Sequence, residues 1–234
     1  MIGGGGIVVN PLWDGLQGYW NADNNPNDSK GSYNGVLTNG ATYGTGIINN
    51  GFSFDGVNDF VNFGDVLDIR LDSWTYNMWL KPNTVGSYVS ILTKSNTTTN
   101  WTRWWIIINA GKIEFSLQPA GEIRWWFTGD STIVAGVETM ISVVVNRNGA
   151  VKIYVNGVEE TVIAKRAGIV IANDISSMNA FNFDIPYILA LGSFNNSLFP
   201  FNGIMDEISI FKAIKTQSEI TELYNGGAGI QYIF

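Results

Sequence analysis

The sequence predicts an all-β protein, a two-sheet antiparallel jelly-roll sandwich with one short helix near the C-terminus. Short segments of alternating apolar and polar residues recur at intervals of about ten residues, with turn residues between them. Asn148-Gly149 joins two of these segments, because both residues tolerate the positive φ angles of a tight hairpin. Apolar residues make up 45% of the 234 residues, enough for a large core, so we expect one domain.

The predicted strands follow one another along most of the chain. They are expected at 16–21, 35–38, 51–54, 59–63, 74–80, 88–93, 103–109, 112–117, 122–127, 139–146, 150–155, 187–192 and 203–211. Residues 161–186 show no single period, which is typical of a loop or insertion. We predict a glycine-rich arm over 1–15, the sandwich over 16–225, and a tail over 226–234 that adds an edge strand or contacts a partner.

The last predicted strand alternates clearly. Ile204, Asp206, Ile208 and Ile210 are expected on one face, and the odd-numbered residues on the other. Asp206 and its neighbour Glu207 should therefore point to opposite faces of the sheet.

A short helix is predicted over residues 216–224. Thr216 and Glu219 fit a capping box, in which the hydroxyl and the carboxylate each accept a hydrogen bond from an unpaired backbone N–H. The pair Asn225-Gly226 suits a left-handed residue at the end of the helix.

Several motifs occur in a fixed order along the chain. They are Gly18-Tyr19-Trp20-Asn21-Ala22-Asp23, Asn27-Asp28-Ser29, Asn34-Gly35-Val36-Leu37, Phe52-Ser53-Phe54-Asp55-Gly56-Val57-Asn58-Asp59-Phe60-Val61, Met78-Trp79-Leu80-Lys81-Pro82, Val151-Lys152-Ile153-Tyr154-Val155-Asn156-Gly157 and Phe201-Asn202-Gly203-Ile204-Met205-Asp206-Glu207-Ile208-Ser209-Ile210-Phe211. In this order, over about residues 16–225, they resemble the laminin G-like, concanavalin A-like jelly rolls. The resemblance implies the fold, but fold and activity are separate inferences.

Composition excludes several classes of function. The chain has 13 basic and 20 acidic residues and a net charge of −7, which argues against nucleic acid or an anionic membrane surface as the partner. No apolar run approaches the roughly 20 residues that span a bilayer, so we expect no membrane insertion. Without cysteine or histidine, disulfides, thiolate metal sites and the commonest general base are absent.

Two adjacent tryptophan pairs, Trp104-Trp105 and Trp125-Trp126, lie in predicted strands. Neighbouring strand residues point to opposite faces, so at most one ring of each pair can face the same core. One interpretation is that loops or a partner subunit cover the outward rings. The other is an aromatic platform that stacks on a sugar while polar groups bind its hydroxyls. The candidate glycan-binding residues are Trp101, Arg103, Trp105, Arg124 and Trp126.

Structural calcium is a further expectation. The loop from Asp23 to Asp28 is rich in carboxylates and amides, the oxygen ligands that calcium prefers. In many laminin G-like jelly rolls this loop packs near the closing strand, so the resemblance implies Asp28 and Asp206 as candidate ligands. The alternative is that these residues only form turns and caps. The pentraxin-like second calcium site is disfavoured, because residues 189–197 contain no carboxylate.

Catalysis is not expected. Glucanases that resemble this fold use a Glu-x-Asp-x-x-Glu strand, and the sequence has no such pattern. We expect a non-catalytic binding or structural protein, at a virion surface or otherwise extracellular, such as a phage capsid-decoration protein, fibre or tail adhesin. Its partners would be other subunits, through the arm and tail, and a cell-surface glycan. The alternatives are a free carbohydrate-binding lectin module and, less favoured, a glycan hydrolase.

Overall fold

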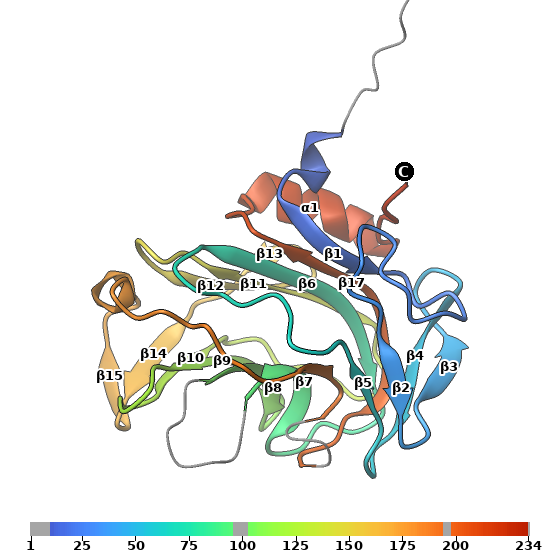
Figure 1. Cartoon of the computed structure of the whole chain (residues 1–234), viewed down its shortest axis with the longest axis horizontal. Helices are drawn as coiled ribbons and strands as arrows, with labels where there is room; N and C mark the ends of the chain where they lie inside the picture. The colour runs from blue at the N-terminus through green and yellow to red at the C-terminus, as the bar shows by residue number, and fades with distance from the viewer. Residues whose placement is uncertain (1–9, 96–102, 194–197, 234) are drawn as a thin grey trace, which may run out of the picture.

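The structure is a computed structural model that describes residues 10–95, 103–193 and 198–233, and these residues form two antiparallel β-sheets packed face to face (Figure 1). In spatial order the first sheet contains β13 (Val158–Glu159), β12 (Val151–Val155), β11 (Thr139–Val145), β6 (Trp74–Pro82), β17 (Asn202–Phe211), β4 (Asn50–Asp55) and β3 (Thr42–Thr45), with β1 (Leu16–Trp20) also paired to β17. The second sheet contains β15 (Ile169–Ile171), β14 (Ile163–Arg166), β10 (Trp125–Thr128), β9 (Lys112–Gln118), β8 (Arg103–Asn109), β7 (Val89–Lys94), β16 (Leu189–Leu191), β5 (Phe60–Asn62) and β2 (Val36–Thr38). The predicted jelly-roll sandwich is confirmed.

The space between the sheets holds the main hydrophobic core. Every second residue of the long strands turns into it, as the period of a half-buried strand requires. Tyr76 of the first sheet and Trp104 of the second meet across this core, with ring centroids 4.8 Å apart. Both side chains are fully buried, and burial of a large apolar side chain contributes about 2–3 kcal/mol to stability.

The predicted C-terminal helix is present as α1 (Gln217–Tyr224). The Thr216 hydroxyl accepts a hydrogen bond from the backbone N–H of Glu219, and the Glu219 carboxylate accepts one from the backbone N–H of Thr216. Asn225 ends the helix in the left-handed conformation, with φ of 49°. The predicted capping box is therefore confirmed. No helix in the described ranges has the length and apolar character needed to cross a membrane.

Helix α1 and both ends of the described chain cover the outer side of the first sheet (Figure 1). The buried residues beneath this cover form a second cluster, here called the outer cluster: Leu12, Leu16, Tyr19, Trp79, Met140, Val144, Tyr154, Phe211, Ile220 and Leu223. In the tail, Tyr232 packs edge-on against Trp13 and Tyr19, at centroid distances of 5.2 and 5.7 Å. The edge strand predicted for the tail does not form within residues 226–233, where the chain packs through side chains instead.

The segment predicted as a loop or insertion over 161–186 contains two strands instead. Strands β14 and β15 form a hairpin that extends the second sheet beyond β10. Ala167 and Gly168 make its turn, both with positive φ, at 52° and 78°. The sequences of β14 and β15, Ile-Ala-Lys-Arg and Ile-Val-Ile, do not alternate between apolar and polar residues. Strands β3 and β13 were not predicted either.

Strand β17 contains a β-bulge at Glu207, whose φ is 51°. The extra residue shifts the alternation by one position. An odd-numbered residue before the bulge and an even-numbered residue after it therefore point to the same side of the sheet. The main core accordingly contains Met205, Ile208 and Ile210. The prediction that Ile204 shares a face with Ile208 and Ile210 is wrong, because spacing alone cannot show a one-residue bulge.

Candidate functional site

The two tryptophan pairs divide between the two sides of the second sheet. Trp104 of β8 is fully buried in the main core, and Trp125 of β10 packs against that core. Trp105 and Trp126 lie on the outer side and form a small cluster with Ile107. The alternation expected of neighbouring strand residues therefore holds in both pairs.

Trp105 and Trp126 contact each other although their strands are not neighbours. Strand β9 runs between β8 and β10, and its residue Ser116 is paired with both tryptophans. The two ring centroids are 5.6 Å apart, while two strand spacings amount to about 9.6 Å. The small serine side chain leaves the space over β9 in which the rings meet.

Two arginines cover part of this aromatic pair. The guanidinium carbon of Arg124 lies 4.3 Å from the Trp105 ring centroid and 4.6 Å from that of Trp126. Arg103 places its guanidinium carbon 4.8 Å from the Trp105 centroid. Trp105 is only 5% exposed as a result, whereas Trp126 stays partly exposed. The exposed aromatic surface is thus the ring of Trp126, and the fifth candidate, Trp101, lies outside the described residues.

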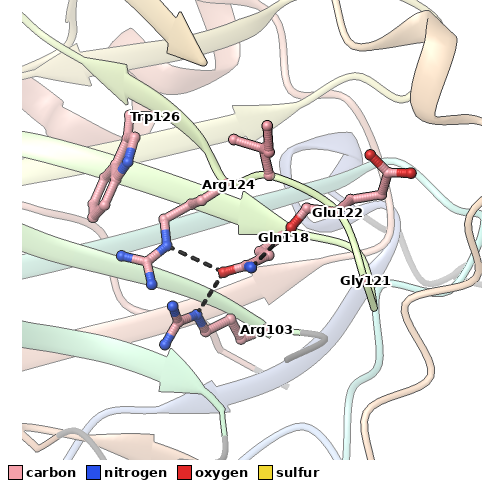
Figure 2. Close-up of a pocket in the computed structure, with 7 residues that line it drawn as sticks. Arg103, Gln118, Gly121, Glu122, Arg124 and Trp126 are labelled. Carbon is pink, nitrogen blue, oxygen red and sulfur yellow. Dashed lines mark hydrogen bonds between the residues drawn. The ribbon is translucent and has the colours of Figure 1, made fainter. Parts of the chain in front are cut away.

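One glutamine fixes both arginines. The Oε1 atom of Gln118 accepts hydrogen bonds from the Nε of Arg103 at 3.0 Å and from the Nε of Arg124 at 3.3 Å (Figure 2). The Nε2 of Gln118 donates to the backbone oxygen of Glu122 at 2.9 Å, which sets the orientation of the amide. The two cations are therefore held side by side at a single neutral acceptor.

These side chains line an open pocket of about 570 Å³ at the outer side of the second sheet (Figure 2). Its residues are Arg103, Gln118, Gly121, Glu122, Ile123, Arg124 and Trp126. The Glu122 carboxylate pairs with Arg166, at 3.2 Å, and Figure 2 shows it turned away from the other two arginines. Burial lowers the pKa of Arg124 to about 10, so the side chain is still a cation at neutral pH. The pocket is cationic in a chain whose net charge is −7.

Sequence reasoning missed Gln118 and also Glu114, which lies on the same side of β9. Glu114 is buried, and its Oε2 accepts hydrogen bonds from Asn109 Nδ2 at 3.3 Å and Thr128 Oγ1 at 3.2 Å. Burial raises the pKa of this carboxyl group. The sequence feature that could have identified Gln118 is the two-residue turn between β8 and β9, because this turn places Gln118 directly opposite Arg103.

A laminin G-type family model, described as the concanavalin A-like lectin/glucanases superfamily, matches residues 55–221. The chain belongs to this superfamily. The matched region includes all three strands that carry the pocket, β8, β9 and β10. A comparison of the sequence with curated proteins finds no match.

Several solved structures are similar to this chain in fold. Domain 4 of AbnA, a GH43 extracellular arabinanase from Geobacillus stearothermophilus, in complex with arabinotriose, is 22% identical, with a TM-score of 0.65 over 88% of this chain and 97% of that domain. The binding domain of Paraclostridial Mosquitocidal Protein 1 is 15% identical, with a TM-score of 0.69 over 92% of this chain. The binding domain of botulinum neurotoxin DC, in complex with SialylT, is 17% identical, with a TM-score of 0.65 over 92%. The chain spans 52% of each of these two toxin domains, and at such identities the likeness shows the fold.

The two candidate calcium ligands of this superfamily domain bind backbone N–H groups. Asp28 accepts hydrogen bonds from the N–H groups of Tyr19, Lys30 and Tyr33, at 2.9, 2.9 and 3.2 Å. The Oδ2 of Asp206 likewise accepts from two backbone N–H groups, at 2.9 and 3.1 Å. Oxygens that face N–H donors do not fit a cation, and no cluster of three acidic, histidine or cysteine residues suited to a metal occurs in the described ranges. Calcium binding stays a prediction, which thermal unfolding with calcium and with a chelator would test.

The adjacent carboxyl groups of Asp206 and Glu207 lie on the same side of the first sheet, not on opposite faces as predicted. The bulge turns Glu207 outward, where it accepts a short hydrogen bond from the hydroxyl of Tyr19 in the outer cluster. Asp206 accepts from the backbone N–H of Ile47, which packs on that cluster too. Burial raises the pKa of Asp206 to about 7 and that of Glu207 to about 8.

Proposed function

We propose that the chain is a non-catalytic carbohydrate-binding domain whose saccharide lies in the pocket beside Trp126. The observation that carries the proposal is the exposed Trp126 ring next to three polar side chains in fixed positions, those of Arg103, Gln118 and Arg124. An aromatic ring packs on the apolar face of a pyranose or furanose ring, and neighbouring donors hydrogen-bond its hydroxyl groups. The aromatic ring and the hydrogen-bond donors are present on the same side of the second sheet.

Rigidity supports a binding role. The strands β8, β9 and β10 fix the backbone, and Gln118 fixes the two arginines before any ligand arrives. A site that is already ordered loses less conformational entropy on binding than a flexible one. The arabinanase domain in complex with arabinotriose and the toxin binding domain in complex with SialylT agree with a saccharide as the ligand class.

A hydrolytic role has less support. Retaining glycosidases place two carboxyl groups about 5 Å apart on either side of a bound sugar. The adjacent pair here, Asp206 and Glu207, is buried in the outer cluster, and the cavity beside Asp206 measures about 10 Å³. That volume accommodates one water molecule and no sugar.

Binding to a glycan array, followed by calorimetry with the best-bound glycan, tests the proposal. We expect Trp126→Ala to weaken binding at least about fivefold, since stacking of a ligand ring on an aromatic side chain contributes roughly 1–3 kcal/mol and 1 kcal/mol corresponds to about fivefold in affinity. Tyr187→Ala is the matched control, because Tyr187 is an exposed aromatic residue that does not line the pocket. No binding to any glycan, or equal binding by wild type and Trp126→Ala, would contradict the proposal.

The setting of the domain is a separate proposal. Display on a virion or another extracellular assembly would use the arm over 1–15, of which residues 1–9 lie outside the described ranges, and a partner contact of the tail. The native mass of the full chain and of a chain without residues 1–10 tests it. A defined oligomer that the truncation abolishes would support assembly through the arm, and two monomers would count against it.

A further inference from the structure

The pocket beside Trp126 brings two positive charges together without a carboxylate at Arg124. The Nε atoms of Arg103 and Arg124 share one acceptor, Gln118 Oε1, so the guanidinium groups are neighbours. Within the described residues, no carboxylate oxygen lies within 4.0 Å of Arg124. The acidic residue of the pocket, Glu122, pairs with Arg166. At Arg124, neutral Gln118 occupies the position that a carboxylate would have in an ion pair.

The arrangement leaves the outer ends of Arg124 available for a ligand. Its Nε is used by Gln118, and in the described ranges no hydrogen bond from its two Nη atoms is found. Figure 2 shows the guanidinium groups of Arg103 and Arg124 facing the same open space. A guanidinium binds a carboxylate best in a planar, two-point arrangement, and such charge-assisted bonds are about twice as strong as neutral ones.

The electrostatic surroundings favour an anion as well. Partial burial lowers the pKa of Arg124, which means that its charge is incompletely solvated. Lys165, on strand β14, is paired with Trp126 and adds a third cation on this side of the sheet. The acidic group on the same side, Glu114, is buried and accepts hydrogen bonds from Asn109 and Thr128. An incoming negative charge would offset the repulsion between the cations.

We propose that the ligand is an acidic saccharide, with its carboxylate on Arg124 and Arg103 and a sugar ring on Trp126. This inference rests on the proposed function and narrows it to one class of saccharide. A sulfate ester is the alternative anionic group that the experiment below distinguishes, since a guanidinium binds both. A carboxylate attached directly to a sugar ring fits the adjacent positions of the Trp126 ring and the two cations.

Calorimetry with two matched trisaccharides tests the inference. The probes are α-1,4-linked trigalacturonate and α-1,4-linked galactotriose, which differ only in the carboxylates, and a sulfated heparin disaccharide forms a third arm. We expect trigalacturonate to bind at least about tenfold more tightly than galactotriose, and the difference to shrink as the salt concentration rises. Tighter binding of the heparin disaccharide than of trigalacturonate would show that the site prefers a sulfate ester, and it would contradict the proposal of a carboxylate ligand.

Arg124→Gln should abolish the preference for trigalacturonate while leaving the fold intact, as judged by an unchanged melting temperature within a few degrees. Arg70→Gln is the charge-matched control, because Arg70 is exposed and pairs with Asp184 outside the pocket. Equal binding of both trisaccharides, with a loss in Trp126→Ala and none in Arg124→Gln, would overturn the inference but leave carbohydrate binding standing. If neither these three probes nor a glycan array gives binding, both proposals fail.

Discussion

The outer sides of the two sheets have the same strand alternation and both carry tryptophan, yet they are used differently. On the first sheet, Trp79 is buried beneath α1, where its ring stacks on Tyr224 with a centroid distance of 5.7 Å. On the second sheet, no helix lies over Trp105 and Trp126 within the described residues, and two arginines pack on the rings instead. An outward tryptophan therefore does not indicate function by itself. The role of such a tryptophan depends on whether another part of the chain covers it with apolar side chains.

The covered side stabilises the fold, because the outer cluster removes a large apolar area from water. The open side carries charged groups whose burial would cost free energy, and these groups lie at the rim of a pocket. We therefore expect substitutions on the covered side to change the free energy of unfolding, and those on the open side to change binding.

Trp79→Ala should be the most destabilising single change on either outer side. Removal of a buried tryptophan costs about 3–5 kcal/mol, because contacts are lost and a cavity remains. For a chain of this length, each kcal/mol corresponds to about 2–4 °C in melting temperature. Denaturant unfolding measures the loss, and Glu222→Ala on the exposed side of α1 is the control. A loss below about 1 kcal/mol would mean that the cover contributes little.

Raising the pH should destabilise the covered side through Glu207. The folded-state pKa is about 8, above the usual 4.5, so the folded protein binds this proton more tightly than the unfolded chain. The contribution is complete below pH 4.5 and is lost as the pH rises towards 8. One pKa unit corresponds to about 1.4 kcal/mol, so we expect a loss of more than 1 kcal/mol between pH 5 and 8.

Glu207→Gln separates this effect from the other ionisable groups. The amide cannot ionise and still accepts the hydrogen bond from Tyr19, so unfolding of the variant should depend less on pH. Glu222→Gln, which is exposed, should leave the dependence unchanged. An equal slope in wild type and Glu207→Gln would show that Glu207 is ionised in the folded protein at neutral pH.

Much of this contrast could be predicted from the sequence, and the missing parts have identifiable causes. The capping box predicted α1, and period-two alternation predicted that the two rings of each tryptophan pair point to opposite sides of the sheet, although not which ring faces outward. Composition could not show which side α1 covers, because that depends on how the chain folds back over distant strands. The role of Gln118 depends on the register of β8 and β9, which a two-residue Ala-Gly turn sets and which alternation alone does not give.

The bulge at Glu207 is the clearest failure of pattern reading. A single residue with φ of 51° reverses the alternation of β17 and brings two carboxyl groups to one side. Nothing in the spacing of Ile204, Asp206 and Ile208 differs from a regular strand. The outward position of Glu207, beside the hydroxyl of Tyr19 in the outer cluster, follows from that one backbone angle.

Thr216→Ala should lower the free energy of unfolding without changing how α1 packs on the first sheet. The hydroxyl accepts a hydrogen bond from the N–H of Glu219, and loss of such a cap costs about 1 kcal/mol. Ser218→Ala, at an exposed position of the same helical turn, should cost less than about 0.5 kcal/mol. Denaturant unfolding compares the two variants. Equal stability of both would mean that tertiary contacts, rather than the capping box, set the start of α1.

Trp126→Ala should have the smallest effect on stability, about 1 kcal/mol or less, although it removes the same type of side chain as Trp79→Ala. Trp126 is partly exposed, its contacts are with Trp105 and Arg124, and its loss leaves no closed cavity. Saccharide binding should weaken in this variant while the melting temperature stays within a few degrees of wild type. A loss of stability comparable to that of Trp79→Ala would show that Trp126 stabilises the fold. The covered and the open side would then both contribute to stability, in different amounts.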